Sequence, residues 1–168
     1  MQPYFYYQLQ QSDFSIQSLD QKLQKQCPKS GAIVTFSGLV RDGLLGANQA
    51  EHITANTKEN QVRSIELSCY KSLCEKQIKS IGEQAFEKFE LDGLVVIHRY
   101  GDLKVQQQIV FVGVASKHRK DAFLAAEMTM DFLKSKVAFW KKEHYTNGQK
   151  SKWIEPVSDD YVSLNKWQ

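Results

Sequence analysis

The order of strand-like and helix-like segments restricts the fold of this chain more than any other feature of the sequence. Runs of β-branched and aromatic residues predict strands at 4–10, 31–40, 62–70, 93–103 and 108–116. Apolar residues at helical spacing predict helices at 15–26, 72–89 and 119–136. This order mixes hairpins with longer crossovers. We therefore expect an α+β sandwich of mixed sheet and packed helices, and not a doubly wound parallel sheet.

The same spacing predicts which side chains are buried. We expect a well-buried strand at 31–40, a half-buried strand at 62–70 and a long surface loop from 42 to 61. The second helix is expected to bury Leu73, Ile78, Ile81, Ala85 and Phe89, and the third Phe123, Ala126, Met130 and Leu133. The segment "VAFWKKE" is expected to continue as a helix end, followed by a turn at Asn147-Gly148 and a short strand at Trp153-Ile154.

Length and composition indicate one soluble domain spanning residues 1–168. A net charge of +3 is too small by itself to indicate a nucleic-acid binder. Cys27, Cys69 and Cys74 include no CxxC pair, which predicts reduced thiols in a cytoplasmic protein. The N-terminus lacks the pattern of a signal peptide, and no apolar run approaches the ~20 residues of a membrane span.

Basic residues occur where the predicted segments end, which is where loops usually assemble a site. The groups are Arg41, His98-Arg99, His118-Arg119 and the lysines from Lys134 to Lys142. Each also has an ordinary interpretation. Arg41 has an adjacent partner for an ion pair in Asp42, His98 fits a satisfied half-buried histidine, and lysines near a helix C-terminus favour the helix dipole.

Lys134 and Lys141 are seven residues apart, which places them on one helix face if the helix continues that far. Together with "SKHR" at 116–119 they predict a pocket for a phosphate or carboxylate. Crowded cations also lower the pKa of a lysine. A nucleic-acid surface would have similar charges and remains an alternative. No glycine-rich phosphate loop is present, and the histidines lack the spacing of metal ligands.

Five blocks of the sequence, taken together, resemble one protein family. They are "GAIVTFSGLVRD", "LVVIHRYGDL", "VGVASKHRKDAF", "MDFLKSKVAFWKKE" and "KWIE". In this order they are similar to the large, catalytic subunit of molybdopterin synthase, over residues 31–155. The chain departs from the family pattern at Ala138, where the family has proline.

This resemblance implies an α/β-hammerhead fold, a homodimer and a small ubiquitin-like partner whose C-terminal Gly-Gly carries a thiocarboxylate. It implies that the tail of the partner donates sulfur to cyclic pyranopterin monophosphate, forming the dithiolene of molybdopterin. Neither a metal nor another cofactor is implied for this step.

The resemblance also implies residue roles. Lys134 and Lys141 match the catalytic lysines of the family, and the substrate-binding positions correspond to Phe36, Arg41, His118 and Arg119. The lysines would steady the thiocarboxylate and the charge that develops as sulfur adds. Two other functions remain open, a module that binds nucleic acid or an acidic partner, and a thiol-based sulfurtransferase using Cys69 or Cys74.

Overall fold

The computed structural model describes residues 2–42, 62–146, 150–154 and 163–167 of the chain. The helices are α1 (Ile16–Gln26), α2 (Lys71–Lys88), α3 (Arg119–Lys136) and the short 3-10 helix η2 (Ser163–Trp167). The strands are β1 (Tyr4–Gln10), β2 (Ala32–Leu39), β3 (Val62–Cys69), β4 (Leu91–Arg99), β5 (Gly101–Lys104), β6 (Gln108–Ser116), β7 (Phe139–Tyr145) and β8 (Lys152–Ile154). The predicted loop at 43–61 and the turn at Asn147-Gly148 lie outside the described residues.

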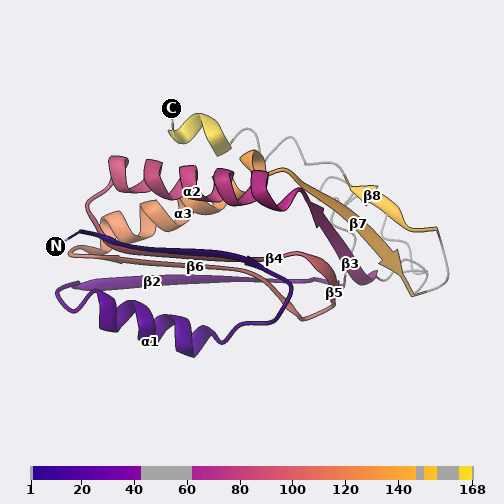
Figure 1. Cartoon of the computed structure of the whole chain (residues 1–168), viewed down its shortest axis with the longest axis horizontal. Helices are drawn as coiled ribbons and strands as arrows, with labels where there is room; N and C mark the ends of the chain where they lie inside the picture. Colours follow the sequence, from indigo (N-terminus) through magenta and orange to yellow (C-terminus); the bar gives the residue numbers. More distant parts are fainter. Residues whose placement is uncertain (1, 43–61, 147–149, 155–162, 168) are drawn as a thin grey trace, which may run out of the picture.

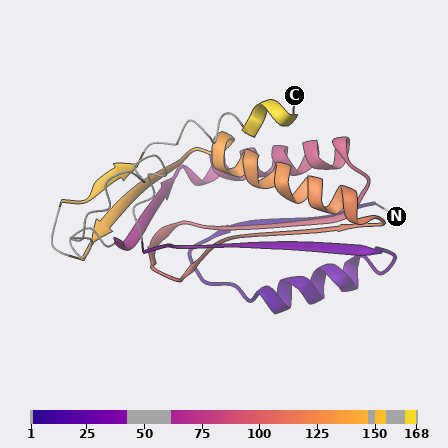
Figure 2. The same ribbon diagram turned by 180° about the vertical axis from the view of Figure 1, so that it is seen from behind.

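Four strands form the larger sheet, sheet A, in the order β1-β4-β6-β2. β1 runs parallel to β4, and the other two pairs are antiparallel. Helices α2 and α3 lie along one face of this sheet and α1 lies along the other (Figures 1 and 2). The predicted α+β sandwich of a mixed sheet and packed helices is confirmed.

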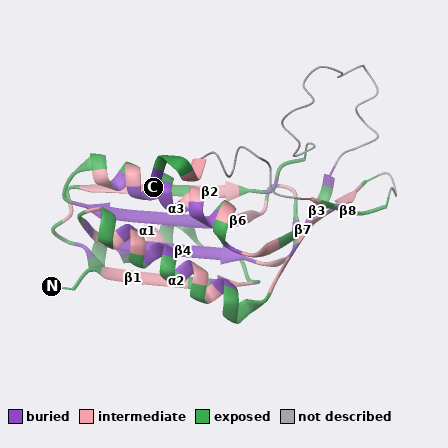
Figure 3. Ribbon diagram, turned by 90° about the horizontal axis from the view of Figure 1, so that it is seen from above, coloured by how far each residue is buried: buried purple, intermediate pink, exposed green. Residues whose placement is uncertain are grey.

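The central strands of sheet A are apolar on both faces because helices cover both faces. Leu94, Val96 and Val112 pack in the core beneath α2 and α3. Val95 and Phe111 belong to the second core, on the side of α1. β4 and β6 accordingly appear buried along most of their length in Figure 3. Packing against helices on both faces makes sheet A the rigid part of the molecule.

Sheet B is antiparallel, has the order β5-β3-β7-β8 and lies at one end of sheet A (Figure 1). The single strand predicted at 93–103 is wrong, because the chain passes from β4 in sheet A to β5 in sheet B at this point. Gly101 adopts a φ of +94°, which side chains other than glycine rarely tolerate, and this residue makes the bend possible.

Some burial predictions were wrong where a segment lies at the edge of the fold. β2 pairs with β6 on one side and forms an edge of sheet A, so Phe36 and Leu39 are 43% and 45% exposed. The predicted helices are confirmed, but Leu73 of α2 and Phe123 of α3 are exposed rather than inward. Cys74 takes the buried position beside Leu73, and Ile78, Ile81 and Ala85 are buried as expected.

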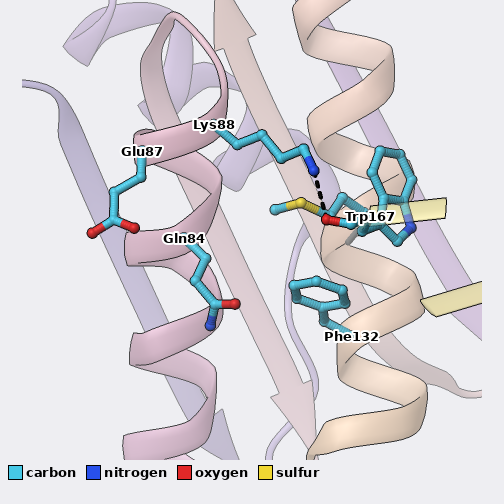
Figure 4. Close-up of a pocket in the computed structure, with 6 residues that line it drawn as sticks. Gln84, Glu87, Lys88, Phe132 and Trp167 are labelled. Carbon is cyan, nitrogen blue, oxygen red and sulfur yellow. Dashed lines mark hydrogen bonds between the residues drawn. The ribbon is translucent and has the colours of Figure 1, made fainter. Parts of the chain in front are cut away.

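The C-terminal helix η2 packs against α2 and α3 through Trp167 (Figure 4). The indole Nε1 of Trp167 donates a hydrogen bond to Asp131 at 2.7 Å, and Lys88 donates to the main-chain oxygen of Trp167 at 2.6 Å. Phe132 and Lys88 line a hollow of about 250 Å³ beside this contact. Among the described residues, no helix is long and apolar enough to cross a membrane.

Candidate active site

Lys141 lies in β7, and its side chain is only 22% exposed. Its Nζ atom is 3.3 Å from Oε1 of Glu143, whose side chain is 1% exposed. The two residues share one face of the strand because side chains alternate with a period of two. The hydroxyl of Tyr145, the next residue on this face, donates to Oε2 of Glu143 at 3.1 Å. Oε2 of Glu143 therefore accepts a hydrogen bond, whereas Oε1 has no hydrogen-bond partner and only the ammonium group of Lys141 as its ion-pair partner. These two contacts offset part of the cost of burying the charge.

Sequence reasoning did not identify Glu143, although it is part of the block "FWKKE". The structure shows why. β7 replaces the helix end that the sequence predicted over this segment, so that expectation was wrong. Val137, Phe139 and Trp140 favour extended backbone, and β7 pairs with β3 over its whole length. A strand period of two, applied to Lys141, would have identified Glu143 and Tyr145.

Lys134 lies in the last turn of α3, just before the chain enters β7. It is close enough to Lys141 to influence it electrostatically, but not because the two share a helix face. α3 ends at Lys136, and Val137 already has extended dihedral angles. The predicted proximity is confirmed, whereas the predicted geometry, seven residues along one helix, was wrong.

Arg41 follows β2 and is exposed beside the buried Val40. Val40 makes two main-chain hydrogen bonds of 2.9 Å, with Gln106 and Gln107 in the turn between β5 and β6. These bonds fix the main-chain position from which the side chain of Arg41 extends. Burial lowers the pKa of Lys141 most, Glu143 opposes the shift, and the charges of Arg41 and Lys134 lower it further. Arg41, Lys134 and Lys141 thus form one cationic cluster at the junction of the two sheets.

His118 and Arg119 are not part of this cluster within one chain. They lie exposed at the start of α3, and Lys134 comes fifteen positions after Arg119 in the same helix. At 1.5 Å per residue this separation is about 22 Å along the helix. Figure 1 shows the start of α3 at the end of the molecule opposite to sheet B. The six predicted site residues therefore do not meet in a single copy of the chain.

Phe36 lies on β2, five residues before Arg41, which is about 16 Å along a strand. It lines a hollow of about 400 Å³ between β2 and α3. Val34, Phe123, Ala126 and Met130 provide apolar walls. Met130, in the lining of this hollow, comes one helical turn before Lys134, so the hollow leads toward that lysine along α3.

The other basic pair, His98-Arg99, is structural. Burial lowers the pKa of His98 to about 4, and the ring stacks on Phe139 with centroids 4.1 Å apart. Arg99 is 6% exposed and donates to main-chain oxygens of Gln11 and Gln108. The interpretation of His98 as a satisfied histidine agrees with the 2.9 Å contact between its Nδ1 atom and the main-chain oxygen of Arg99, but the residue is buried rather than half-buried.

The two thiols near the cluster are poor nucleophiles. Burial raises the pKa of Cys69, and burial together with the adjacent Cys69 raises that of Cys74 to about 12. Since the thiolate is the reactive form, this disfavours a thiol-based sulfurtransferase. In the described part of the chain, no group of three or more His, Cys, Asp or Glu side chains is placed to hold a metal ion.

Comparison with known proteins identifies the family. Residues 9–136 match the family model described as "MoaE protein". A molybdopterin synthase catalytic subunit of Brucella melitensis is 35% identical over 156 residues, which cover 93% of this chain and 86% of that protein. The chain belongs to the MoaE family. The predicted family of molybdopterin synthase catalytic subunits, enzymes that transfer sulfur, is confirmed.

Solved structures support this assignment. The molybdopterin cofactor biosynthesis protein E of Burkholderia multivorans has a TM-score of 0.76 and 30% identity, with 98% of this chain and 97% of that chain covered. A complex of subunits 1 and 2 of molybdopterin-converting factor from Helicobacter pylori shares the fold at 18% identity, with a TM-score of 0.65 over 89% of this chain and 90% of that chain. Lys141 lies outside the residues matched by the family model, and Lys134 lies inside them.

Proposed function

We propose that this MoaE-family chain transfers sulfur from the thiocarboxylated C-terminus of a small ubiquitin-like subunit to cyclic pyranopterin monophosphate. The observation that carries the proposal is the cationic cluster of Arg41, Lys134 and Lys141, in which Glu143 orients a half-buried lysine. Both reactants are anionic, and cations at a partly desolvated site attract anions more strongly than cations in water. The product is the dithiolene of molybdopterin, made for molybdenum cofactor biosynthesis in the cytoplasm.

The lysines have complementary roles in this proposal. Lys134 is exposed and binds the incoming thiocarboxylate, whereas Lys141 is held in one orientation by Glu143 and faces the charge that develops as sulfur adds. The lowered pKa of Lys141 also makes its ammonium group a better proton donor than an ordinary lysine. Arg41 holds the cyclic phosphate, for which its guanidinium is well suited.

The partner subunit and a second copy of the chain complete the site. The complex from Helicobacter pylori joins the two subunits of molybdopterin-converting factor, which supports a small subunit as the partner here. His118 and Arg119 are about 22 Å from Lys134 within one chain, so they reach the phosphate only from another copy. A two-fold axis perpendicular to α3 reverses that helix, which places the start of one α3 beside the end of the other.

The test is sulfur transfer in a defined mixture. It contains this chain, a thiocarboxylated ubiquitin-like subunit and cyclic pyranopterin monophosphate, and the dithiolene is followed through its fluorescent oxidised derivative. Lys134→Ala and Lys141→Ala are each expected to lower the rate at least about 100-fold, the loss typical of a transition-state contact. The matched control is Lys142→Ala, because Lys142 lies on the opposite face of β7, over the ring of Trp153.

Each outcome separates the candidate functions. Activity that is lost with the two site variants and kept in Lys142→Ala supports the proposed roles. No product from a folded protein with its partner bound would contradict the proposed reaction. In that case, strongly salt-dependent binding of nucleic acid would favour the binding-module alternative.

A further inference from the structure

The two lysines of the cationic cluster are carried by different elements, and the connection between those elements is very short. α3 ends at Lys136 and β7 begins at Phe139, so only Val137 and Ala138 lie between them. The angle between the helix and the strand determines where Lys134 lies relative to Lys141. Whatever fixes the two connecting residues therefore fixes the geometry of the site.

Ala138 is the centre of a tight turn. The N–H of Phe139 donates to the carbonyl oxygen of Val137 at 2.8 Å, which closes a three-residue γ-turn. Among the described residues, Gln106 is the only non-glycine residue with a positive φ, so the turn at Ala138 is the inverse type. The central residue of an inverse γ-turn has a φ of about −75°.

Two side chains from α2 hold Ala138 by both of its main-chain polar groups. Oε1 of Gln77 accepts a hydrogen bond from the N–H of Ala138 at 3.1 Å. The thiol of Cys74 donates to the carbonyl oxygen of Ala138, with Sγ and oxygen 3.4 Å apart. Cys74 and Gln77 are three residues apart and therefore share one face of α2. Side chains of α2, which is distant in sequence, thus hold the connection between α3 and β7 through hydrogen bonds.

Gln77 differs in this respect from a second glutamine of the same helix. Nε2 of Gln84, two turns later and also half-buried, donates to the carbonyl oxygen of Ser80 within α2 itself. Gln77 instead bonds to a residue 61 positions away. Removing its acceptor would leave the N–H of Ala138 without this partner, and such a loss loosens the local backbone.

We propose that Gln77 is a positioning residue that holds the turn at Ala138, and through it sets the distance between Lys134 and Lys141. This inference rests on the proposed function for its activity readout. It also makes a structural prediction that is independent of that function, because the electrostatic influence of Lys134 and Arg41 on Lys141 depends on the same geometry.

Proline at position 138 offers a way to replace the hydrogen bond with a covalent restraint. The proline ring fixes φ near −65°, close to that of an inverse γ-turn. The preceding residue, Val137, has φ −89° and ψ 126°. This is the extended region, which a residue before proline can adopt without a steric clash. Ala138→Pro removes the N–H group from which Gln77 accepts its hydrogen bond. In that background, replacing Gln77 should no longer change the geometry of the turn.

The first experiment is a double-mutant cycle on sulfur transfer. Gln77→Met keeps the length and helix propensity of the side chain but removes the amide, and Gln84→Met is the matched control. We expect Gln77→Met to lower kcat about tenfold with a smaller change in KM, because misplaced catalytic groups affect the reaction more than binding. Gln84→Met should change kcat less than about twofold. In the Ala138→Pro background, Gln77→Met should also change kcat less than about twofold.

The second experiment follows the titration of Lys141 by NMR of ¹³Cε-labelled lysine, assigned with Lys141→Arg. In Gln77→Met, the pKa of Lys141 is expected to rise toward that of an ordinary lysine, and Ala138→Pro is expected to reverse the rise. If Gln77→Met moves neither kcat nor the titration, or moves both equally in the two backgrounds, the inference is wrong. If the wild type makes no product while the titration shifts as expected, the proposed function fails and the positioning role stands.

Discussion

The two sheets of this molecule differ in what they bury. Sheet A is covered by helices on both faces, and its central strands bury apolar side chains such as Val95, Val96 and Phe111. Sheet B holds a charged pair in β7, the half-buried Lys141 and the buried Glu143. An apolar sheet needs only good packing, whereas a buried charge needs a partner at a defined distance. Under the proposed function, this difference predicts that sheet A mainly provides stability, whereas β7 of sheet B contributes charged groups to the reaction.

Besides the bend from β4 into β5, two features join the sheets. The ring of His98, at the end of β4 in sheet A, stacks on Phe139, at the start of β7 in sheet B. Helix α3 begins with Arg119 over the far end of sheet A and carries Lys134 to the junction with sheet B. Away from these connections, substitutions in sheet A should therefore change stability, and substitutions in sheet B should change activity.

The largest effect is expected from a cavity in sheet A. Phe111→Ala removes a fully buried ring that packs edge-on against Phe14, with centroids 6.2 Å apart. Such a change typically lowers the free energy of unfolding by about 3–5 kcal/mol. Urea denaturation measures this loss, and sulfur transfer per folded molecule should stay close to that of the wild type. A loss of activity while the variant is fully folded would show that the sheets are not separable in this way.

The same contrast explains what sequence reasoning could reach. The strands and helices around sheet A follow from apolar spacing, because burial on a regular surface leaves a periodic trace in the sequence. The path from β4 into β5 does not, since it depends on one positive φ at Gly101. β7 was predicted as a helix end because "VAFWKKE" continues a helical segment without a proline or glycine to stop it.

The candidate site residues came from the sequence, but their arrangement in space did not. The family resemblance identified the cations, and Arg41, Lys134 and Lys141 do gather in the structure. The separation of His118 from Lys134 follows from the length of α3, which a resemblance between short blocks does not reveal. Glu143 required the strand period, and Gln77 required a contact across 61 residues.

A second prediction tests the connection at His98 by pH. The pKa of His98 is about 4 in the folded protein, below the ordinary value of 6.5, so the unfolded chain binds this proton first as the pH falls. Stability is therefore lost between about pH 6.5 and pH 4, by about 3 kcal/mol at most for a shift of this size. His98→Gln should lose correspondingly less stability over this range, measured as denaturation midpoints. Parallel curves for both proteins would contradict a buried, neutral histidine.

The smallest expected effect is a partial recovery of activity when two inactive variants are mixed, and it tests whether the two ends of α3 act in different copies. His118→Ala and Lys134→Ala are each expected to be inactive as pure proteins. In a mixed dimer of the two variants, one of the two shared sites has both Lys134 and the partner's His118 intact. Random association makes about half of the dimers mixed, so co-expression should restore about a quarter of the wild-type activity.

The control for this mixture combines variants at the same end of the molecule. Lys134→Ala and Lys141→Ala both change the junction with sheet B, so a mixed dimer has one altered lysine in each site and should remain inactive. Recovery in the first mixture alone would mean that the start of α3 from one copy serves the end of α3 in the other. An absence of recovery in both mixtures, with dimers present, would contradict a site that is shared between two copies. The proposed chemistry would then depend on the cationic cluster of a single chain, at the junction of the two sheets.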